Sequence, residues 1–267
     1  MKNNPIVISN EHTSFNFSFL TYINIFLFLG LMFSVGFNLA AVNENKKLAE
    51  VNYKLNEVIH VLESKYLDKE DEIILTKFQK TLVDHYDYIK EDNRRKREID
   101  KIQNFITSIS DEDLDEEYLK TISTAFYDAS EKYELDYKEL IAVAWHENRF
   151  HPTRKSNVGA VGVMQIMPLW VNRSAEFRSE IGAQEVSDLE NPVLNIFGGA
   201  FIYRKYYDYW DNKIKDKMMV RKLALLSYNR GKNKVRNLLK QGKNPENNYS
   251  IVVLSKLNKI NNLEKNM

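Results

Sequence analysis

The chain has no cysteine in its 267 residues, and this absence excludes disulfide bonds, cysteine nucleophiles and thiolate metal sites. It also lacks a dominant charge, because 38 lysines and arginines face 37 aspartates and glutamates, for a net charge of +1. A protein without a broad positive field has little with which to hold phosphates, so we expect no nucleic-acid partner. With 43% hydrophobic and 28% charged residues, the composition is ordinary for a folded protein and argues against a wholly disordered chain.

One long segment lacks charge altogether. No Lys, Arg, Asp or Glu lies between His12 and Asn43, and residues 17–42 are apolar enough to cross a bilayer as a helix of about 20 residues. A cleaved signal peptide is the alternative, but this apolar core is too long for one, and the sequence FNLAAV has no good small-x-small cleavage site. We therefore expect residues 1–43 to form an N-terminal tail and a single transmembrane anchor.

Glycine and proline are missing from residue 44 to about 110, a charged and helix-favouring region that we interpret, over residues 44–115, as a helical stalk. Apolar residues recur there in steps of three and four, at Leu48, Val51, Leu55, Val58 and Leu62, and again at Ile99, Ile102, Phe105 or Ile106, and Ile109. The first set resembles a heptad seam, so self-association as a coiled coil is one interpretation. A solvated helical spacer is favoured, because a clean seam lasts too few heptads.

The acidic sequence SDEDLDEE at residues 110–117 indicates a boundary and a helix start, with Ser110 or Asp111 as the N-cap. We place the third region at residues 116–267. Most of the glycines fall there, and no series of alternating strands is visible. The expected fold class is therefore mainly α, with at most a small β element near residues 158–166.

The sequence HENRFH invites comparison with the zinc-protease motif His-Glu-x-x-His, in which histidines four residues apart share one helix face. Here the spacing is five, which turns the two rings about 140° apart on a helix. Pro152 also disfavours helical backbone at His151. We therefore interpret His146 and His151 as packing or surface residues and expect no metal site.

Glu147 lies near the end of the predicted helix YELDYKELIAVAWHENRF, on an apolar face with Leu140, Val143 and Ala144. Partial burial there would raise the pKa of the carboxyl group, as a general acid working near neutral pH requires. A lone glutamate at a helix end is more often solvated or ion-paired, so the interpretation depends on its neighbours in the sequence.

Those neighbours form a longer pattern. The sequence ENRFHPTRKSNVGAVGVMQIMP, which begins at Glu147, is followed by NPVLNIFGGAFIY from Asn191, by LSYNRG at 226–231 and by Tyr249 in ENNYSIVVLSKL. In this order and spacing, the motifs resemble the signature of the soluble lytic transglycosylase (SLT) family, relatives of goose-type lysozyme. The resemblance covers about residues 120–260 and implies a lysozyme-like helical catalytic domain in that part of the chain.

The resemblance also implies roles for residues, with Glu147 as the catalytic acid. The substrate-binding residues that it implies are Asn148, Ser156, Gly162, Met164, Gln165, Tyr228, Asn229 and Tyr249. The amides of Gln165 and Asn229 would suit the N-acetyl and hydroxyl groups of an aminosugar, while the methionine and Tyr228 would offer apolar faces. Gly162, with Gly159, would let the backbone approach a bulky sugar chain.

The reaction of this family needs no metal and no cofactor. One glutamic acid protonates the glycosidic oxygen and then, as a carboxylate, takes the proton of the sugar's own C6 hydroxyl, which closes a 1,6-anhydro ring. The substrate's N-acetyl group stabilises the oxocarbenium-like state, an exception to the usual pair of carboxylates. After Glu147 the next acidic residue is Glu176, so no second carboxylate is obvious in the motif.

We therefore expect a membrane-anchored peptidoglycan lytic transglycosylase that cleaves the β-1,4 bond between N-acetylmuramic acid (MurNAc) and N-acetylglucosamine (GlcNAc) in glycan strands. A lysozyme-like muramidase is one alternative. Another is a weakly active wall-binding scaffold of an envelope-spanning secretion, conjugation or phage machine, with protein partners in the envelope. The substrate implies a single-pass inner-membrane protein with its catalytic domain on the periplasmic or wall side. Against this, Lys46, Lys47 and Lys54 follow the anchor and only Lys2 precedes it, so the positive-inside tendency would place the domain in the cytoplasm.

Overall fold

The computed structural model describes residues 53, 69–111, 113–151 and 153–265. The predicted anchor at residues 17–42 and the apolar positions from Leu48 to Leu62 lie outside the described residues. In the part of the chain that is described, no helix is both long and apolar enough to span a membrane. The chain divides into two compact units, Met1–His85 and Tyr86–Met267.

The described chain is built from helices. They are α3 (Lys69–Ile109), α4 (Glu116–Tyr133), α5 (Tyr137–Glu147), α6 (Leu169–Arg173), α7 (Ala175–Ile181), the 3-10 helix η1 (Val186–Glu190), α8 (Pro192–Asp211), α9 (Lys217–Arg230), α10 (Lys232–Lys240) and α11 (Asn248–Glu264). The described residues contain no β-strand, and two isolated bridges join Val161 to Lys155 and to Ile166. The prediction of a mainly α fold is confirmed, and its small β element is reduced to these two bridges.

The end of α3 belongs to the core of the second unit. The side chains that it buries there are Ile99, Ile102, Phe105, Ile106 and Ile109. They are the second apolar stripe of the predicted stalk, so this part of the stalk is a packing face and not a solvated spacer. The second unit accordingly begins at Tyr86, before the start at residue 116 that the sequence suggested.

The expected helix start at Ser110 or Asp111 is wrong by a few residues. Helix α3 continues to Ile109, and after a short linker the side chain of Asp115 accepts a hydrogen bond from the backbone N of Tyr118 and caps α4. Two glutamates follow in the first turn of α4, where carboxylates interact favourably with the positive end of the helix.

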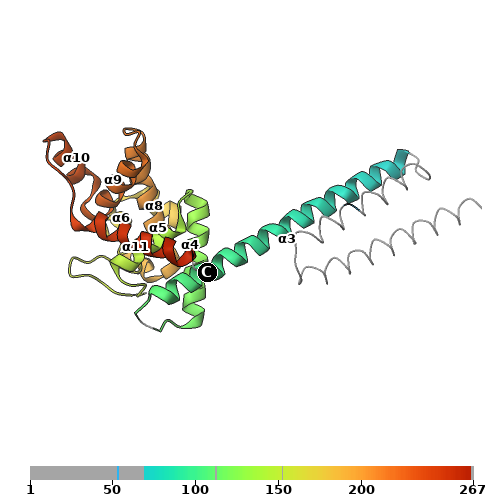
Figure 1. The fold of residues 1–267 in the computed structure, drawn as a ribbon, viewed down its shortest axis with the longest axis horizontal. Coiled ribbons are helices and arrows are strands. Elements are labelled where there is room, and N and C mark those ends of the chain that lie inside the picture. The colour runs from blue at the N-terminus through green and yellow to red at the C-terminus, as the bar shows by residue number, and fades with distance from the viewer. Residues whose placement is uncertain (1–52, 54–68, 112, 152, 266–267) are drawn as a thin grey trace, which may run out of the picture. The chain divides into compact units, whose positions relative to one another are not determined.

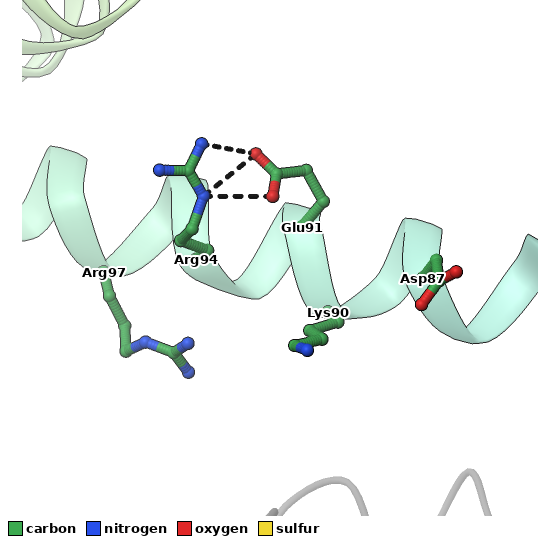
Figure 2. Close-up of a pocket in the computed structure, with 5 residues that line it drawn as sticks. All are labelled: Asp87, Lys90, Glu91, Arg94 and Arg97. Atoms are coloured by element: carbon green, nitrogen blue, oxygen red, sulfur yellow. Dashed lines mark hydrogen bonds and ion pairs between the residues drawn. The ribbon is translucent and has the colours of Figure 1, made fainter.

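The basic sequence RRKR, residues 94–97, lies on α3, and two of its arginines pair with carboxylates of α4. Figure 2 shows Arg94 turned toward Glu91 one turn earlier, and its Nη2 lies 3.0 Å from a carboxylate oxygen of Glu131. Arg95 donates to both carboxylate oxygens of Asp128, at 2.9 and 2.8 Å. Because these pairs are half exposed, they stabilise the fold less than the buried stripe does, but they help to select the face of α3 that meets α4.

Helix α8 lies in the middle of the second unit, in contact with α4, α7, η1 and α9 (Figure 1). Its two glycines admit the loop that carries the sequence GAVGVMQIMP. A Cβ at Gly199 would lie 2.6 Å from Cβ of Met164, and one at Gly198 would lie 2.8 Å from Cδ1 of Ile166. The loop therefore packs directly on α8, while α11 packs against α5 and α9.

Candidate active site

Glu147 is the last residue of α5, and the chain turns sharply after it. Arg149 and Phe150 both have positive φ, of 59° and 68°. Phe150 anchors this turn, because its ring is fully buried against Phe126 and its carbonyl oxygen accepts a hydrogen bond from the hydroxyl of Tyr118. The turn holds the Glu147 carboxyl group at the helix end in a partly buried position.

Tyr249, in the first turn of α11, contacts Glu147 directly. Its hydroxyl donates a hydrogen bond to Oε1 of Glu147 with 2.6 Å between the oxygens, and its ring meets the ring of His146 at 4.9 Å. Burial raises the pKa of Glu147 to about 7, and the hydrogen bond from Tyr249 opposes that rise. At neutral pH such a group exists in both protonation states, which suits a residue that must first donate a proton and then accept one.

Two buried asparagines hold the loop beside Glu147. Asn148 donates through Nδ2 to the carbonyl oxygen of Gly162 at 2.7 Å. Asn195 of α8 accepts a hydrogen bond from the backbone N of Met164 at 2.7 Å and donates to the carbonyl oxygen of Val161 at 2.9 Å. The side chain of Asn148 is thus used inside the protein, and Asn195 is a supporting residue to which the sequence motif assigns no role.

The glycine at 162 is required by packing inside the protein. Its φ is 78°, and a Cβ added to it would lie 2.3 Å from Nδ2 of Asn195 and 2.7 Å from the carbonyl oxygen of Leu189. The space left by the missing side chain is therefore filled by α8 and η1. By contrast, a Cβ at Gly159, whose φ is 85°, would meet no atom within 4 Å, so only the backbone conformation of Gly159 calls for glycine.

Tyr228 of α9 lies near Glu147 and Tyr249. Burial and the neighbouring Glu147 carboxylate raise the pKa of the Tyr228 hydroxyl well above its usual range. That hydroxyl donates to the carbonyl oxygen of Met164 at 2.7 Å. The side chain of Met164 is fully buried, so in this structure Met164 meets the site through its backbone and offers no apolar face to solvent.

The remaining predicted binding residues take part in local hydrogen bonds and keep some exposure. The hydroxyl oxygen of Ser156 accepts from a backbone N of its own loop at 3.0 Å. Gln165, with φ of 49°, donates to the carbonyl oxygen of Gly162 at 2.9 Å. The exposed Asn229 accepts from Nδ2 of Asn247 at 3.0 Å, which links the end of α9 to the start of α11.

Helix α5 holds a second carboxylate, Glu139, which no motif in the sequence singles out. It is 3% exposed, accepts a hydrogen bond from the hydroxyl of Tyr203 at 2.6 Å and pairs with Arg221 at 3.1 Å. It precedes Glu147 by eight residues, about 12 Å of helix rise, whereas the carboxyl groups of two-carboxylate glycosidases lie roughly 5–9.5 Å apart. An acidic residue in the first turn of a helix usually faces solvent, so no sequence signal indicates that Glu139 is buried.

Part of the chain is similar to known proteins. Residues 124–251 match the model of the Transglycosylase SLT domain. Over 105 residues the chain is 31% identical to the transglycosylase of Enterobacteria phage PRD1. This alignment covers 39% of this chain and 33% of that protein. Over 109 residues it is 28% identical to the membrane-bound lytic murein transglycosylase F of Cellvibrio japonicus. That alignment covers 41% of this chain and 20% of that protein.

The chain therefore spans about a third or less of the length of these relatives. Among solved structures, it is similar to an inactive mutant of the lytic transglycosylase Slt from Pseudomonas aeruginosa. The identity is 22% and the TM-score is 0.44, over 53% of this chain and 24% of that chain.

Proposed function

From the transglycosylase SLT domain that residues 124–251 of this chain carry, we propose that the protein is a lytic transglycosylase of peptidoglycan. It cleaves the β-1,4 bond between MurNAc and GlcNAc with Glu147 as the acid and then the base. The observation that carries this proposal is the Glu147 carboxyl group itself, partly buried at a helix end, hydrogen-bonded by Tyr249 and with a pKa raised to about 7.

In the first step, protonated Glu147 donates its proton to the glycosidic oxygen, the bond from this oxygen to C1 of MurNAc breaks, and GlcNAc leaves with a free 4-hydroxyl. The Glu147 carboxylate then takes the proton of the C6 hydroxyl of the same MurNAc. The C6 oxygen bonds to C1 and closes the 1,6-anhydro ring, so the acid is regenerated without water. The hydrogen bond from Tyr249 stabilises Glu147 in its charged form between the two steps.

The surroundings of Glu147 favour this route over a reaction with two carboxylates. Glu139, the other acid on α5, is separated from it by two helix turns and is occupied by Tyr203 and Arg221. A mechanism with one carboxylate needs a second stabilising group, and the substrate's N-acetyl oxygen can supply it. A lysozyme-like muramidase would use the same acid but release a reducing end.

The decisive experiment is mass analysis of the muropeptides released from purified cell wall by the wild type and by Glu147→Gln. We expect anhydro products, lighter by one water than reducing products, from the wild type and none from the variant. Reducing ends alone would replace the transglycosylase assignment with a muramidase. A correctly folded wild type that releases nothing would favour the wall-binding scaffold of an envelope machine, and full cleavage by the variant would refute the role of Glu147.

We further propose that residues 17–42 anchor the protein in the inner membrane, with the stalk leading to a catalytic domain on the periplasmic or wall side. The apolar length of the segment and the location of the substrate support this, whereas the lysines after the segment oppose it. Protease added to spheroplasts should digest residues 116–267 if the domain lies outside the cytoplasm, and protection of this region would reverse the topology. Cross-linking of the full-length chain through its many lysines would reveal self-association of the stalk.

A further inference from the structure

A cluster of positive charge lies where α5 and α11 pack together. Nζ of Lys256 sits 3.5 Å above the centre of the Trp145 ring, and Nζ of Lys259 lies 5.8 Å from the same ring. Such contacts attract a cation to the face of an aromatic ring, but they leave its charge unneutralised. Two ammonium groups are thus held at a single indole.

No carboxylate of the described residues neutralises either lysine. Among the ion pairs formed by the described residues, none includes Lys256 or Lys259. Arg149 adds a third positive charge nearby. It pairs with Asp111 at 2.6 Å, but both side chains of this pair are more than half exposed, so solvent weakens the pairing. Burial, Lys259 and Arg149 all lower the pKa of Lys256, while Asp111 opposes this effect. The cluster therefore carries a local positive potential in a chain whose net charge is only +1.

The cluster adjoins the candidate active site through both helices. On α5, Trp145 precedes Glu147 by two residues, and on α11, Lys256 follows Tyr249 by two helix turns. His146 lies between the two sites, because its ring contacts Tyr249 and its pKa is lowered by burial and by Lys256. A ligand long enough to extend from Glu147 along α11 would reach the ammonium groups.

We propose that Lys256 and Lys259, over Trp145, form a subsite for the carboxylates of the peptide stems that branch from the glycan strand. This inference rests on the proposed function, since the stems are part of peptidoglycan. An ammonium group forms strong, charge-assisted hydrogen bonds with a carboxylate, and the exposed part of the indole offers an apolar surface to the aliphatic stem residues. The subsite would favour strands that retain their peptides over strands from which the peptides have been removed.

The test measures binding by the full-length chain with Glu147→Gln, which should hold strands without cleaving them. Three soluble glycan strands are compared: one with intact peptide stems, one with the stem carboxylates amidated, and one with the stems removed by an amidase and the lactyl carboxylates that this exposes then amidated. Adding Lys256→Gln and Lys259→Gln should weaken binding of the intact strands by about three- to tenfold, as expected for one or two partly exposed charge pairs. Binding of the other two strands should not change.

The matched control is Lys213→Gln, because Nζ of Lys213 also lies over an aromatic ring, 4.5 Å from the centre of Tyr209, but in the chain that follows α8. This variant should bind all three strands as its parent does, and thermal melting by circular dichroism should show that every variant is folded. The subsite is refuted if the parent binds the three strands equally, or if the double lysine change weakens all three alike. It is also refuted if that change weakens only binding to vesicles of anionic lipid.

The two proposals fail in different ways. If the wild type cleaves cell wall but its binding ignores the stem carboxylates, only the subsite is lost. If the wild type neither cleaves cell wall nor binds any of the strands, the proposed function is lost as well.

Discussion

In the proposed reaction, a few side chains set the proton affinity of Glu147. Burial favours its neutral form, and the hydroxyl of Tyr249, 2.6 Å away, favours its charged form. The two effects leave the pKa close to neutral pH, so neither step of the proposed reaction requires a large change in proton affinity. Changes at single residues should therefore appear first in the dependence on pH.

Removing the hydroxyl of Tyr249 should raise the pKa of Glu147 above about 7, because the lost hydrogen bond stabilised the carboxylate. Activity falls as pH rises through this pKa, so in Tyr249→Phe the alkaline limb of kcat/KM should move up by about one pH unit. The control is Tyr228→Phe, whose lost hydroxyl bonds the carbonyl of Met164 instead. An unchanged limb in Tyr249→Phe would show that this bond does not tune the acid.

Glu147→Gln should make the protein more stable at alkaline pH. The pKa of Glu147 is about 7 in the folded protein and near its ordinary value of 4.5 when unfolded, so the folded state binds more protons between these values. Stability of the wild type therefore falls as pH rises from about 4.5 to about 7, by on the order of 1–3 kcal/mol, and the glutamine avoids this loss. Urea unfolding of both proteins at pH 4 and pH 8 measures the effect, and a difference that does not grow with pH would contradict it.

Helices and loops position these side chains by contacts that leave little room for change. The loop carrying Gly162 and Met164 lies against α8 because Gly198 and Gly199 have no side chains and because Asn195 bonds the loop backbone. Packing of this kind tolerates few added atoms, since protein interiors are nearly as dense as organic crystals.

Replacing Gly162 and Gly159 with alanine separates packing from backbone conformation. Gly162→Ala places a Cβ 2.3 Å from Asn195 at a positive φ, and we expect it to destabilise the fold by about 2–4 kcal/mol. Gly159→Ala meets no neighbouring atom and should cost about 1 kcal/mol, from its backbone conformation alone. Thermal or urea unfolding of the two variants measures the difference, and equal losses would argue against a tightly packed loop at Gly162.

At the scale of the whole chain, the compact unit begins earlier than the composition of the sequence suggested. The charged helical region that looks like a uniform stalk ends in a buried stripe, so the compact unit extends back to Tyr86. A domain boundary placed at the acidic sequence of residues 110–117 would cut off the end of α3, whose buried side chains form part of the core.

A fragment of residues 86–267 should therefore fold, whereas a fragment of residues 116–267 should be soluble only in part and melt at a much lower temperature. The shorter fragment lacks Ile102, Phe105 and Ile106, which are fully buried. Their loss removes about 5–9 kcal/mol of apolar burial, comparable to the whole stability of a typical domain. Soluble yield and thermal melting of the two fragments provide the measurement, and equal melting temperatures would show that α3 is dispensable.

Local patterns in the sequence were enough to predict a mainly helical fold and to select Glu147, because helix periodicity and a motif of closely spaced residues are short-range properties. The spacing of the two histidines, one residue longer than in the zinc-protease motif, likewise led us to expect no zinc site there. What short-range patterns cannot contain is the partner that a residue meets across the fold.

Only the tertiary structure decided that Tyr249, 102 residues away from Glu147, donates to its carboxyl group. It likewise decided that Gly162 makes room for Asn195 and that Glu139 is buried with Tyr203. The physical reason is the same in each case. Burial and hydrogen bonding depend on which surfaces of distant helices pack together, and that choice follows from the balance of contacts over the whole core.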